Sequence, residues 1–265
     1  MIRKDLIKEL SLIPFVENPF LEARLILEQE KVSPLKVLNR RRAGEPLSKI
    51  LGQRGFWSLL LNVSKDVLDP RADSEVLIEE VLKSFPDKAA SSSILDLGTG
   101  SGCLLLSLLS EYKNAKGLGV DVSEKALRIA TENACLFKNA SFLKASWQEE
   151  NFVTLCLKLF PEGFDVIVSN PPYIKREDIE TLDEQVKGFD PLLALDGGED
   201  GLECYRQLSK FLPLLLKENG RIFLEIGQDQ EEDVKALMTK ENLCFEGQRK
   251  DYGGIVRCLI FSKKV

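Results

Sequence analysis

An apolar segment that runs into a glycine-rich turn constrains the fold of this chain more than any other feature. Ile94-Leu95-Asp96-Leu97 precedes Gly98-Thr99-Gly100-Ser101-Gly102, and helix-like apolar residues follow from Cys103. A strand, a glycine turn and a helix in this order are typical of an open α/β sheet, in which ligands bind at the carboxyl ends of the strands. We therefore predict a ligand site at this turn.

Short apolar segments alternate with helix-like stretches from about residue 74 onward. The expected strands are residues 94–97, 117–120, 164–168, 221–226, 243–247 and 255–261. Such alternation predicts a mostly parallel sheet with helices on both faces. The apolar positions before residue 50 have helical spacing, and residues 56–63 have strand character. We expect a helical domain at 1–50, a β-hairpin linker at 51–73 and an α/β domain at 74–265.

The composition excludes several kinds of chemistry. The 265-residue chain has no histidine, which rules out Ser-His-Asp catalysis, Cys-His catalysis and histidine-ligated metals. Its six cysteines lack any Cys-x-x-Cys spacing, so we expect reduced thiols and no metal site. No apolar run approaches the length of a membrane span, and the start of the chain lacks a signal-peptide core. We predict a cytoplasmic protein.

The charge distribution bears on the expected partners. The net charge is −6, with +3 in residues 1–50 and −9 in residues 51–265. Neutralisation of phosphates by basic side chains supplies most non-specific affinity for nucleic acid, so the acidic part is a poor binder. We expect no direct nucleic-acid partner, no membrane partner and a monomeric chain.

The spacing within the glycine turn distinguishes between cofactors. G-x-G-x-G at residues 98–102 differs from the G-x-G-x-x-G of dinucleotide binders, and it lacks the Gly-Lys-Ser/Thr of phosphate loops. The next predicted strand ends at Asp121, about 20 residues on, where a carboxylate can accept hydrogen bonds from both hydroxyls of a ribose. A cofactor with a ribose and no pyrophosphate fits, and we predict S-adenosylmethionine. A glycine turn used only for packing is the alternative.

A rigid tetrapeptide, Asn170-Pro171-Pro172-Tyr173, follows the strand predicted at 164–168. Prolines cannot continue a strand ladder, and Pro171 restricts Asn170 to extended geometry. The loop thus holds the side-chain carbonyl of Asn170, a main-chain carbonyl and the Tyr173 ring in fixed relation, which suits a planar NH2 group. We predict that Asn170, Pro171 and Tyr173 are catalytic, and that all four residues bind substrate. A turn with only a structural role is the alternative.

The predicted reaction is methylation of an amide or amino nitrogen. Two acceptors on the N–H bonds favour a more pyramidal nitrogen, whose lone pair then faces a sulfonium methyl group. Positioning in line contributes up to about 7–11 kcal/mol in favourable cases, and preorganised dipoles add to this. The absence of histidine is consistent with loss of the proton to water after methyl transfer.

These motifs together resemble those of the bacterial release factor glutamine methyltransferases. The resemblance extends from about Pro46 to the C-terminus. It is most specific in Leu193-Ala194-Leu195-Asp196-Gly197-Gly198-Glu199-Asp200-Gly201-Leu202. The other matching positions are residues 69–75, 94–102, 120–121, 147 and 168–174.

The resemblance implies the fold, the substrate and the cofactor contacts. The fold is that of class I S-adenosylmethionine-dependent methyltransferases, a Rossmann-like seven-stranded sheet with one antiparallel edge strand and a small N-terminal helical domain that docks the substrate. The substrate is the glutamine in the Gly-Gly-Gln motif of peptide chain release factors, which act in translation termination. The implied cofactor contacts are Gly98, Thr99, Gly100, Ser101, Gly102, Asp121, Trp147 and Asn170.

Four further residues have two interpretations each. Trp147 fits either a core anchor or a neighbour of the adenine ring, and the resemblance favours the second. Arg71 and Glu75 fit either closure over the cofactor or fixation of the hairpin. Glu225, at the end of a predicted strand, fits either a site residue or a structural hydrogen-bond acceptor.

Two other functions compete with glutamine methylation. The first is methylation of the N6 amino group of adenine in DNA or RNA, since that NH2 group is also planar. Such enzymes must reach an unstacked base and usually carry a basic surface, which the −9 charge of residues 51–265 disfavours. The second is a non-enzymatic role as a cofactor-binding interaction protein, which the intact tetrapeptide disfavours.

Overall fold

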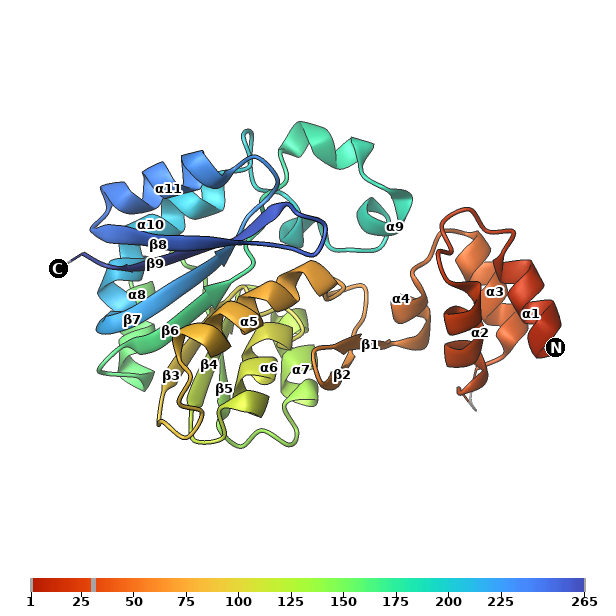
Figure 1. Ribbon diagram of the computed structural model, residues 1–265, viewed down its shortest axis with the longest axis horizontal. Coiled ribbons are helices and arrows are strands. Elements are labelled where there is room, and N and C mark those ends of the chain that lie inside the picture. The colour runs from red at the N-terminus through yellow and green to blue at the C-terminus, as the bar shows by residue number, and fades with distance from the viewer. Residues whose placement is uncertain (1, 30–31, 265) are drawn as a thin grey trace.

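The computed structural model describes residues 2–29 and 32–264, which form a small helical part and a larger α/β part joined by a hairpin (Figure 1). Met1, Glu30, Lys31 and Val265 belong to the predicted domains but lie outside the described residues. Within the described ranges, no helix is both long enough and apolar enough to cross a membrane.

Four short helices form the N-terminal part: α1 (Arg3–Leu10), α2 (Pro19–Leu27), α3 (Pro34–Arg42) and α4 (Leu47–Leu51). Prolines begin α2 and α3, where the missing N–H would have had no helical partner. Asn18 caps α2, because its side chain accepts a hydrogen bond from the amide of Leu21 at 3.0 Å. The helices enclose a separate apolar cluster that includes Leu6, Ile26 and Leu38.

A two-stranded antiparallel hairpin connects the two parts, with strands β1 (Gln53–Phe56) and β2 (Leu59–Asn62). The stretch at 56–63 was expected to contribute to a hairpin. It contains the turn between the two strands, at Trp57 and Ser58, where Trp57 has a positive φ of 52°. The amide of Trp57 donates to Oε1 of Glu75 at 2.8 Å, and the amide of Asn62 donates to Oδ1 of Asn133 at 2.7 Å. These bonds attach the hairpin to two helices of the larger part.

Seven strands form the sheet of the larger part, in the order β5-β4-β3-β6-β7-β9-β8. Their bounds are β3 (Ser93–Leu97), β4 (Lys116–Asp121), β5 (Ala140–Lys144), β6 (Phe164–Ser169), β7 (Leu216–Glu225), β8 (Leu243–Lys250) and β9 (Val256–Lys263). The strands from β5 to β7 are parallel, and β9 is antiparallel to both β7 and β8.

The resemblance implied an antiparallel strand at the edge of the sheet, and this expectation is wrong. The antiparallel strand is β9, which lies between β7 and β8. The chain first crosses to the outer position with β8, and the turn at residues 251–254 then folds β9 back into the gap beside β7. The edge strand is β8, which runs parallel to the strands from β5 to β7.

Helices cover both faces of the sheet (Figure 1). The first face carries α5 (Glu75–Ser84), α6 (Cys103–Glu111) and α7 (Glu124–Asn133), and the second carries α8 (Phe152–Leu159), α10 (Glu203–Leu215) and α11 (Glu231–Lys240). Side chains alternate along β3, so Ile94 packs with residues of α5 and α6, whereas Leu95 and Leu97 pack with residues of α8 and α10. The apolar cores on both faces hold β3 with its carboxyl end at the glycine turn.

Residues 174–202, called the strap below, connect the end of the Asn-Pro-Pro-Tyr loop with α10. The strap contains η2 (Arg176–Thr181), α9 (Glu184–Lys187) and η3 (Leu192–Ala194). In Figure 1, α9 lies on the side of the larger part that faces α3 and α4. Nη1 of Arg41 donates to Oε1 of Gln185 at 3.1 Å, so the N-terminal helices contact the strap as well as the hairpin.

Candidate active site

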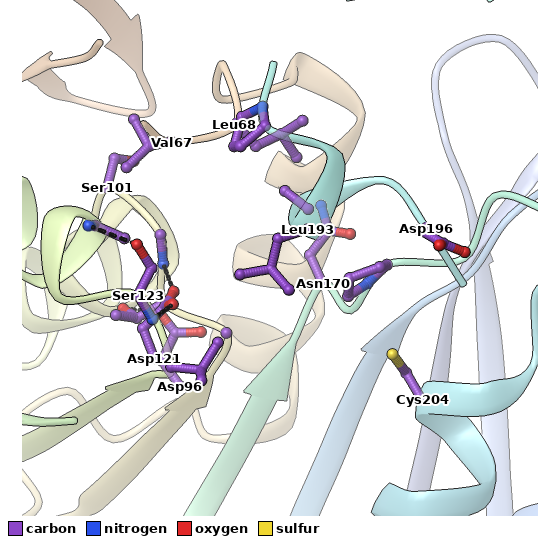
Figure 2. A pocket seen from close by; sticks show the side chains of 18 of the residues that line it. Val67, Leu68, Asp96, Ser101, Asp121, Ser123, Asn170, Leu193, Asp196 and Cys204 are labelled. Carbon is purple, nitrogen blue, oxygen red and sulfur yellow. Dashed lines mark hydrogen bonds between the residues drawn. The ribbon is translucent and has the colours of Figure 1, made fainter. Parts of the chain in front are cut away.

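A cavity of about 400 Å³ lies at the carboxyl ends of β3, β4 and β6. Figure 2 shows Ser101, Asp121 and Ser123 on one side of it, and Asn170 and Leu193 on the opposite side. Eight of the predicted site residues line the cavity: Gly98, Thr99, Gly100, Ser101, Asp121, Trp147, Asn170 and Pro172. The cavity thus brings the glycine turn and the tetrapeptide loop together, as the ends of neighbouring parallel strands should.

Three predicted site residues lie outside the lining of the cavity: Gly102, Pro171 and Tyr173. Gly102 precedes α6 with a φ of 82°, and an added Cβ there would lie 3.2 Å from Leu106. The positive φ and the close packing against α6 therefore explain why glycine is needed at this position. Pro171 is buried at the base of the loop.

The glycine turn is fixed by backbone hydrogen bonds to the neighbouring strand. The amides of Gly98 and Thr99 both donate to the carbonyl of Val120, at 2.9 and 3.0 Å. Gly98 and Gly100 have φ values of 75° and 55°, a region that side chains strongly disfavour. The turn is thus held with its backbone open to the cavity, where a ligand can approach closely.

The carboxylate of Asp121 connects the end of β4 with the turn. Oδ2 accepts from the amide of Gly100 at 2.9 Å, and Oδ1 accepts from the amide of Ser123 at 2.8 Å. Burial raises the pKa of Asp121, and these backbone hydrogen bonds oppose the rise. Asp121 lines the cavity and each of its oxygens can accept a further hydrogen bond, which suits the two hydroxyls of a ribose.

Asp96 is a cavity residue that the sequence interpretation did not include. It is 1 % exposed, and its Oδ2 accepts from the hydroxyl of Thr99 at 2.6 Å. Its Oδ1 has no hydrogen-bond partner among the described residues, and burial raises the pKa of Asp96 to about 7. The available signal was an acidic residue between the apolar residues of a strand, two positions before the glycine turn. An unpaired buried carboxylate oxygen at a cavity suits a cationic group of a ligand.

Trp147 packs against the core and also lines the cavity, so its role as a core anchor leaves its position beside an adenine ring as a prediction. Its ring packs against the core on the second face of the sheet. Two of its ring carbons lie 3.7 Å from where a Cβ on Gly98 would sit. The indole Nε1 donates to Oε1 of Gln207 on α10 at 2.9 Å. Trp147 therefore forms a rigid wall beside the glycine turn.

Asn170 is half-buried at the edge of the cavity, directly after β6. Its Nδ2 donates to the hydroxyl of Ser74 at 3.1 Å. Ser74 is buried next to the first turn of α5, 96 positions earlier in the chain. The bond orients the carboxamide, because Nδ2 faces Ser74 and the carbonyl Oδ1 is left for a ligand.

Tyr173 lies beside the cavity and its side chain contacts the end of β7. An added Cβ on Gly227 would lie 3.0 Å from the Tyr173 ring, and the Tyr173 hydroxyl donates to Oε1 of Glu225 at 3.3 Å. The main-chain carbonyl of Tyr173 accepts from Nε2 of Gln230 at 3.0 Å. Burial raises the pKa of Glu225 to about 7, while Ser74 and Arg257 oppose the rise.

The double-glycine segment of the strap packs directly on the tetrapeptide. The amide of Gly197 donates to the carbonyl of Ile174 at 2.8 Å. An added Cβ would lie 2.8 Å from the carbonyl carbon of Tyr173 if placed on Gly197, and 2.5 Å from its oxygen if placed on Gly201. Both positions require glycine because real Cβ atoms do not approach this closely. These contacts fix the loop backbone from the strap side.

Arg71 and Glu75 have separate roles in the structure. Glu75 accepts the hydrogen bond from Trp57 and so fixes the hairpin. Arg71 lines the cavity, and its Nη2 forms an ion pair with Oδ2 of Asp190 in the strap at 2.6 Å. Among the described residues, no group of three or more His, Cys, Asp or Glu side chains could hold a metal ion.

The fold and this site define a class I methyltransferase. A family model described as a methyltransferase domain matches residues 88–257. The chain is similar in fold to a methyltransferase from Pyrococcus furiosus, with a TM-score of 0.55 and 17 % identity over 86 % of this chain and all of that chain. It is also similar to a ribosomal protein L11 methylase from Lactobacillus delbrueckii subsp. bulgaricus, with a TM-score of 0.53 and 18 % identity over 77 % of this chain and 86 % of that chain.

Sequence comparison places the chain more narrowly. It is 42 % identical to the release factor glutamine methyltransferase of Caulobacter vibrioides, over 88 % of this chain and 84 % of the relative. It is 39 % identical to the protein of the same name from Agrobacterium fabrum, over 96 % of this chain and 86 % of the relative. The chain belongs to the release factor glutamine methyltransferase family, which confirms the resemblance found in its motifs.

Proposed function

We propose that this protein transfers a methyl group from S-adenosylmethionine to the side-chain amide nitrogen of the glutamine in the Gly-Gly-Gln motif of peptide chain release factors, and so supports translation termination. Membership of the family supports this substrate. The observation that carries the proposal is the carboxamide of Asn170, held by Ser74 with its carbonyl free at the edge of the cavity.

The residues around the glycine turn fit the proposed cofactor. The backbone of Gly98 and Gly100 offers a surface without side chains. The carboxylate of Asp121 suits the ribose hydroxyls, and the unpaired Oδ1 of Asp96 suits the ammonium of the methionine end. Trp147 forms an apolar wall for the adenine ring. When bound, the cofactor supplies a methyl group activated by a sulfonium.

The tetrapeptide orients the glutamine nitrogen in the proposed reaction. Oδ1 of Asn170 and a main-chain carbonyl of the loop accept the two amide hydrogens, which turns the nitrogen lone pair toward the methyl group. With the cofactor held at the glycine turn, the nitrogen would gain the methyl group as the sulfur–carbon bond breaks to leave a neutral thioether, and one N–H proton would leave to water. The loop is stiff, so these acceptors need no reorganisation during the reaction. Tyr173 anchors the loop through Glu225.

The remaining parts of the chain recognise the release factor in this proposal. Residues 1–50 dock the protein substrate, residues 51–73 link this domain to the methyltransferase domain at 74–265, and the chain acts as a cytoplasmic monomer without a nucleic-acid partner. The exposed side chains of Leu192 and Leu193 support a role of the strap in this docking, because both lie in the part of the strap that borders the cavity.

Transfer of label to a purified release factor tests the proposal. The protein is incubated with methyl-labelled S-adenosylmethionine and a release factor, and peptides are sequenced by mass spectrometry. We expect one methyl group on the Gly-Gly-Gln glutamine, and no label in a release factor in which that glutamine is glutamate. The Asn170→Ala variant should lose at least about 99 % of the rate. Label in DNA or RNA with none in the release factor would instead support adenine methylation.

A further inference from the structure

Glu225 lies behind the tetrapeptide loop rather than in the cavity. It ends β7, is 1 % exposed, and is absent from the described residues that line the cavity. Its carboxylate accepts from the Tyr173 hydroxyl at 3.3 Å, and the Ser74 hydroxyl lies near enough to hold the pKa of Glu225 below the value that burial alone would give. Ser74 in turn accepts from Nδ2 of Asn170 at 3.1 Å. The two ends of the loop therefore converge on one buried side chain.

The direction of these hydrogen bonds follows from the chemistry of each group. An ionised carboxylate only accepts, whereas a serine hydroxyl has a single hydrogen to donate. If the Ser74 hydrogen points to Glu225, the Ser74 oxygen can only accept from Asn170. Asn170 must then present its NH2 group to Ser74 and its carbonyl to the cavity. An amide with the opposite orientation would present a donor to the substrate NH2 group, which cannot accept it.

We propose that Glu225 is a positioning residue that sets the orientation of the Asn170 carboxamide through Ser74 and anchors the other end of the loop through Tyr173. The inference rests on the proposed function, because the carbonyl of Asn170 matters only if it accepts from a substrate N–H group. Glu225 touches neither substrate nor cofactor in this arrangement.

The fold itself does not require the Glu225 carboxylate. The main-chain carbonyl of Glu225 accepts from the hydroxyl of Tyr205 at 2.7 Å, and β7 pairs with both of its neighbours. The carboxylate oxygen Oε2 has no partner among the described residues. A buried carboxylate with an unpaired oxygen is unfavourable for stability. The fold alone therefore gives no reason for a carboxylate at this position, whereas the proposed action on Ser74 and Tyr173 does.

The Glu225→Gln variant separates the orientation effect from loss of volume. The glutamine NH2 group can donate to Ser74, which frees the Ser74 hydrogen for Oδ1 of Asn170 and reverses the carboxamide. At pH 8, where Glu225 with its pKa of about 7 is mostly ionised, we expect kcat to fall by at least about tenfold, while KM for the release factor and Kd for S-adenosylmethionine change less than about threefold. Glu80→Gln is the matched control, because Glu80 is also buried but lies on α5 and pairs with Lys83 and Arg249. It should retain the wild-type kcat.

A double-mutant cycle tests whether Glu225 acts through Ser74. We expect Ser74→Thr to keep activity and Ser74→Ala to lose it, with the Ser74→Ala/Glu225→Gln double variant no slower than the slower single variant. Independent losses that multiply, or a Glu225→Gln kcat within twofold of wild type, would overturn the proposal. Thermal unfolding of each variant shows whether it is folded.

The side-chain NH2 resonances of Asn170 give a readout that does not depend on activity. In protein labelled with 15N-asparagine, the Asn170→Ala spectrum assigns the pair of resonances. We expect them to shift in Glu225→Gln and to stay in place in Glu80→Gln. Unchanged resonances in Glu225→Gln would contradict the positioning role. Failure of the wild type to methylate any release factor, with the resonances shifted as expected, would instead overturn the proposed function alone.

Discussion

The ammonium of Lys49 lies 3.0 Å from Oδ1 of Asp190, and both side chains are almost fully buried. Lys49 belongs to α4 of the helical part and Asp190 to the strap, so this ion pair joins the N-terminal helices to the segment that supports the tetrapeptide, in addition to the hydrogen bond between Arg41 and Gln185. Asp190 also accepts from the amide of Asp69 at 3.1 Å and pairs with Arg71 at the cavity. The N-terminal helices and the cavity are thus physically connected through Asp190.

Replacement of Lys49 by alanine should destabilise the protein and weaken binding of the release factor. The change leaves Asp190 buried with one cation fewer, which costs about 3 kcal/mol for a broken buried pair. Urea unfolding measures this loss, and titration with the release factor should show a larger loss of affinity than titration with S-adenosylmethionine. Lys125→Ala is the control, because Lys125 pairs with Asp66 at the exposed surface and should contribute less than about 1 kcal/mol. Equal effects of the two changes would contradict this role of the pair.

The strands that hold the glycine turn and the tetrapeptide loop were predictable because each is a short apolar run. β3, β4 and β6 begin and end within one residue of the segments expected at 94–97, 117–120 and 164–168. β5 was missed, because Ala140–Lys144 is an edge strand with only partial burial and no continuous apolar run. The position of β9 inside the sheet depends on the whole order of strands, which local patterns do not contain.

The candidate site was predictable where its residues follow strands, as at Asp121 and Asn170. Ser74 and Gln230 were not predictable, because their contacts with the loop span 96 and 57 positions and exist only once the sheet has formed. Glu225 was visible at the end of a strand, but its partners were not. Local motifs therefore predicted the groups that face the cavity better than the groups that hold them in place.

The Gly201→Ala variant should disturb the tetrapeptide loop from the strap side. Gly201 has a φ of 77°, and its added Cβ would lie 2.5 Å from the carbonyl oxygen of Tyr173 and 2.6 Å from Nε2 of Gln230. We expect a loss of at least about 2 kcal/mol of stability and a kcat reduced by at least about tenfold. Gly247→Ala is the control, because nothing lies within 4 Å of its added Cβ. A Gly201→Ala protein as active and stable as Gly247→Ala would show that the close approach does not matter.

The free energy of unfolding should fall with rising pH through Glu225, whereas a salt-bridged carboxylate would make it rise. Its pKa is raised from 4.5 to about 7, so the folded state holds the proton more tightly than the unfolded state. Stability from this group is therefore present below about pH 4.5 and is lost as pH rises to about 7. Glu225→Gln removes the titration, so it should exceed the wild type by up to about 3 kcal/mol at pH 8 and by nothing near pH 4.5. Urea unfolding at the two pH values measures the difference, and a variant less stable than wild type at pH 8 would contradict the assignment.

Cofactor affinity should depend on pH through Asp96. Burial raises the pKa of this carboxyl to about 7, so the free protein loses the negative charge beside the cavity as pH falls below 7. Oδ1 of Asp96 is the oxygen without a partner, so the ionised form should bind the ammonium of S-adenosylmethionine more tightly. Between pH 7 and pH 5.5 the Kd should rise about tenfold, while Asp96→Asn should bind weakly at both values. Asp121 also has a raised pKa and lines the same cavity, so Asp121→Asn is the control. If this variant keeps the tenfold change of Kd with pH, the change belongs to Asp96. Calorimetry measures each Kd, and a wild-type Kd that is flat over this range would exclude Asp96 as the group that meets the ammonium.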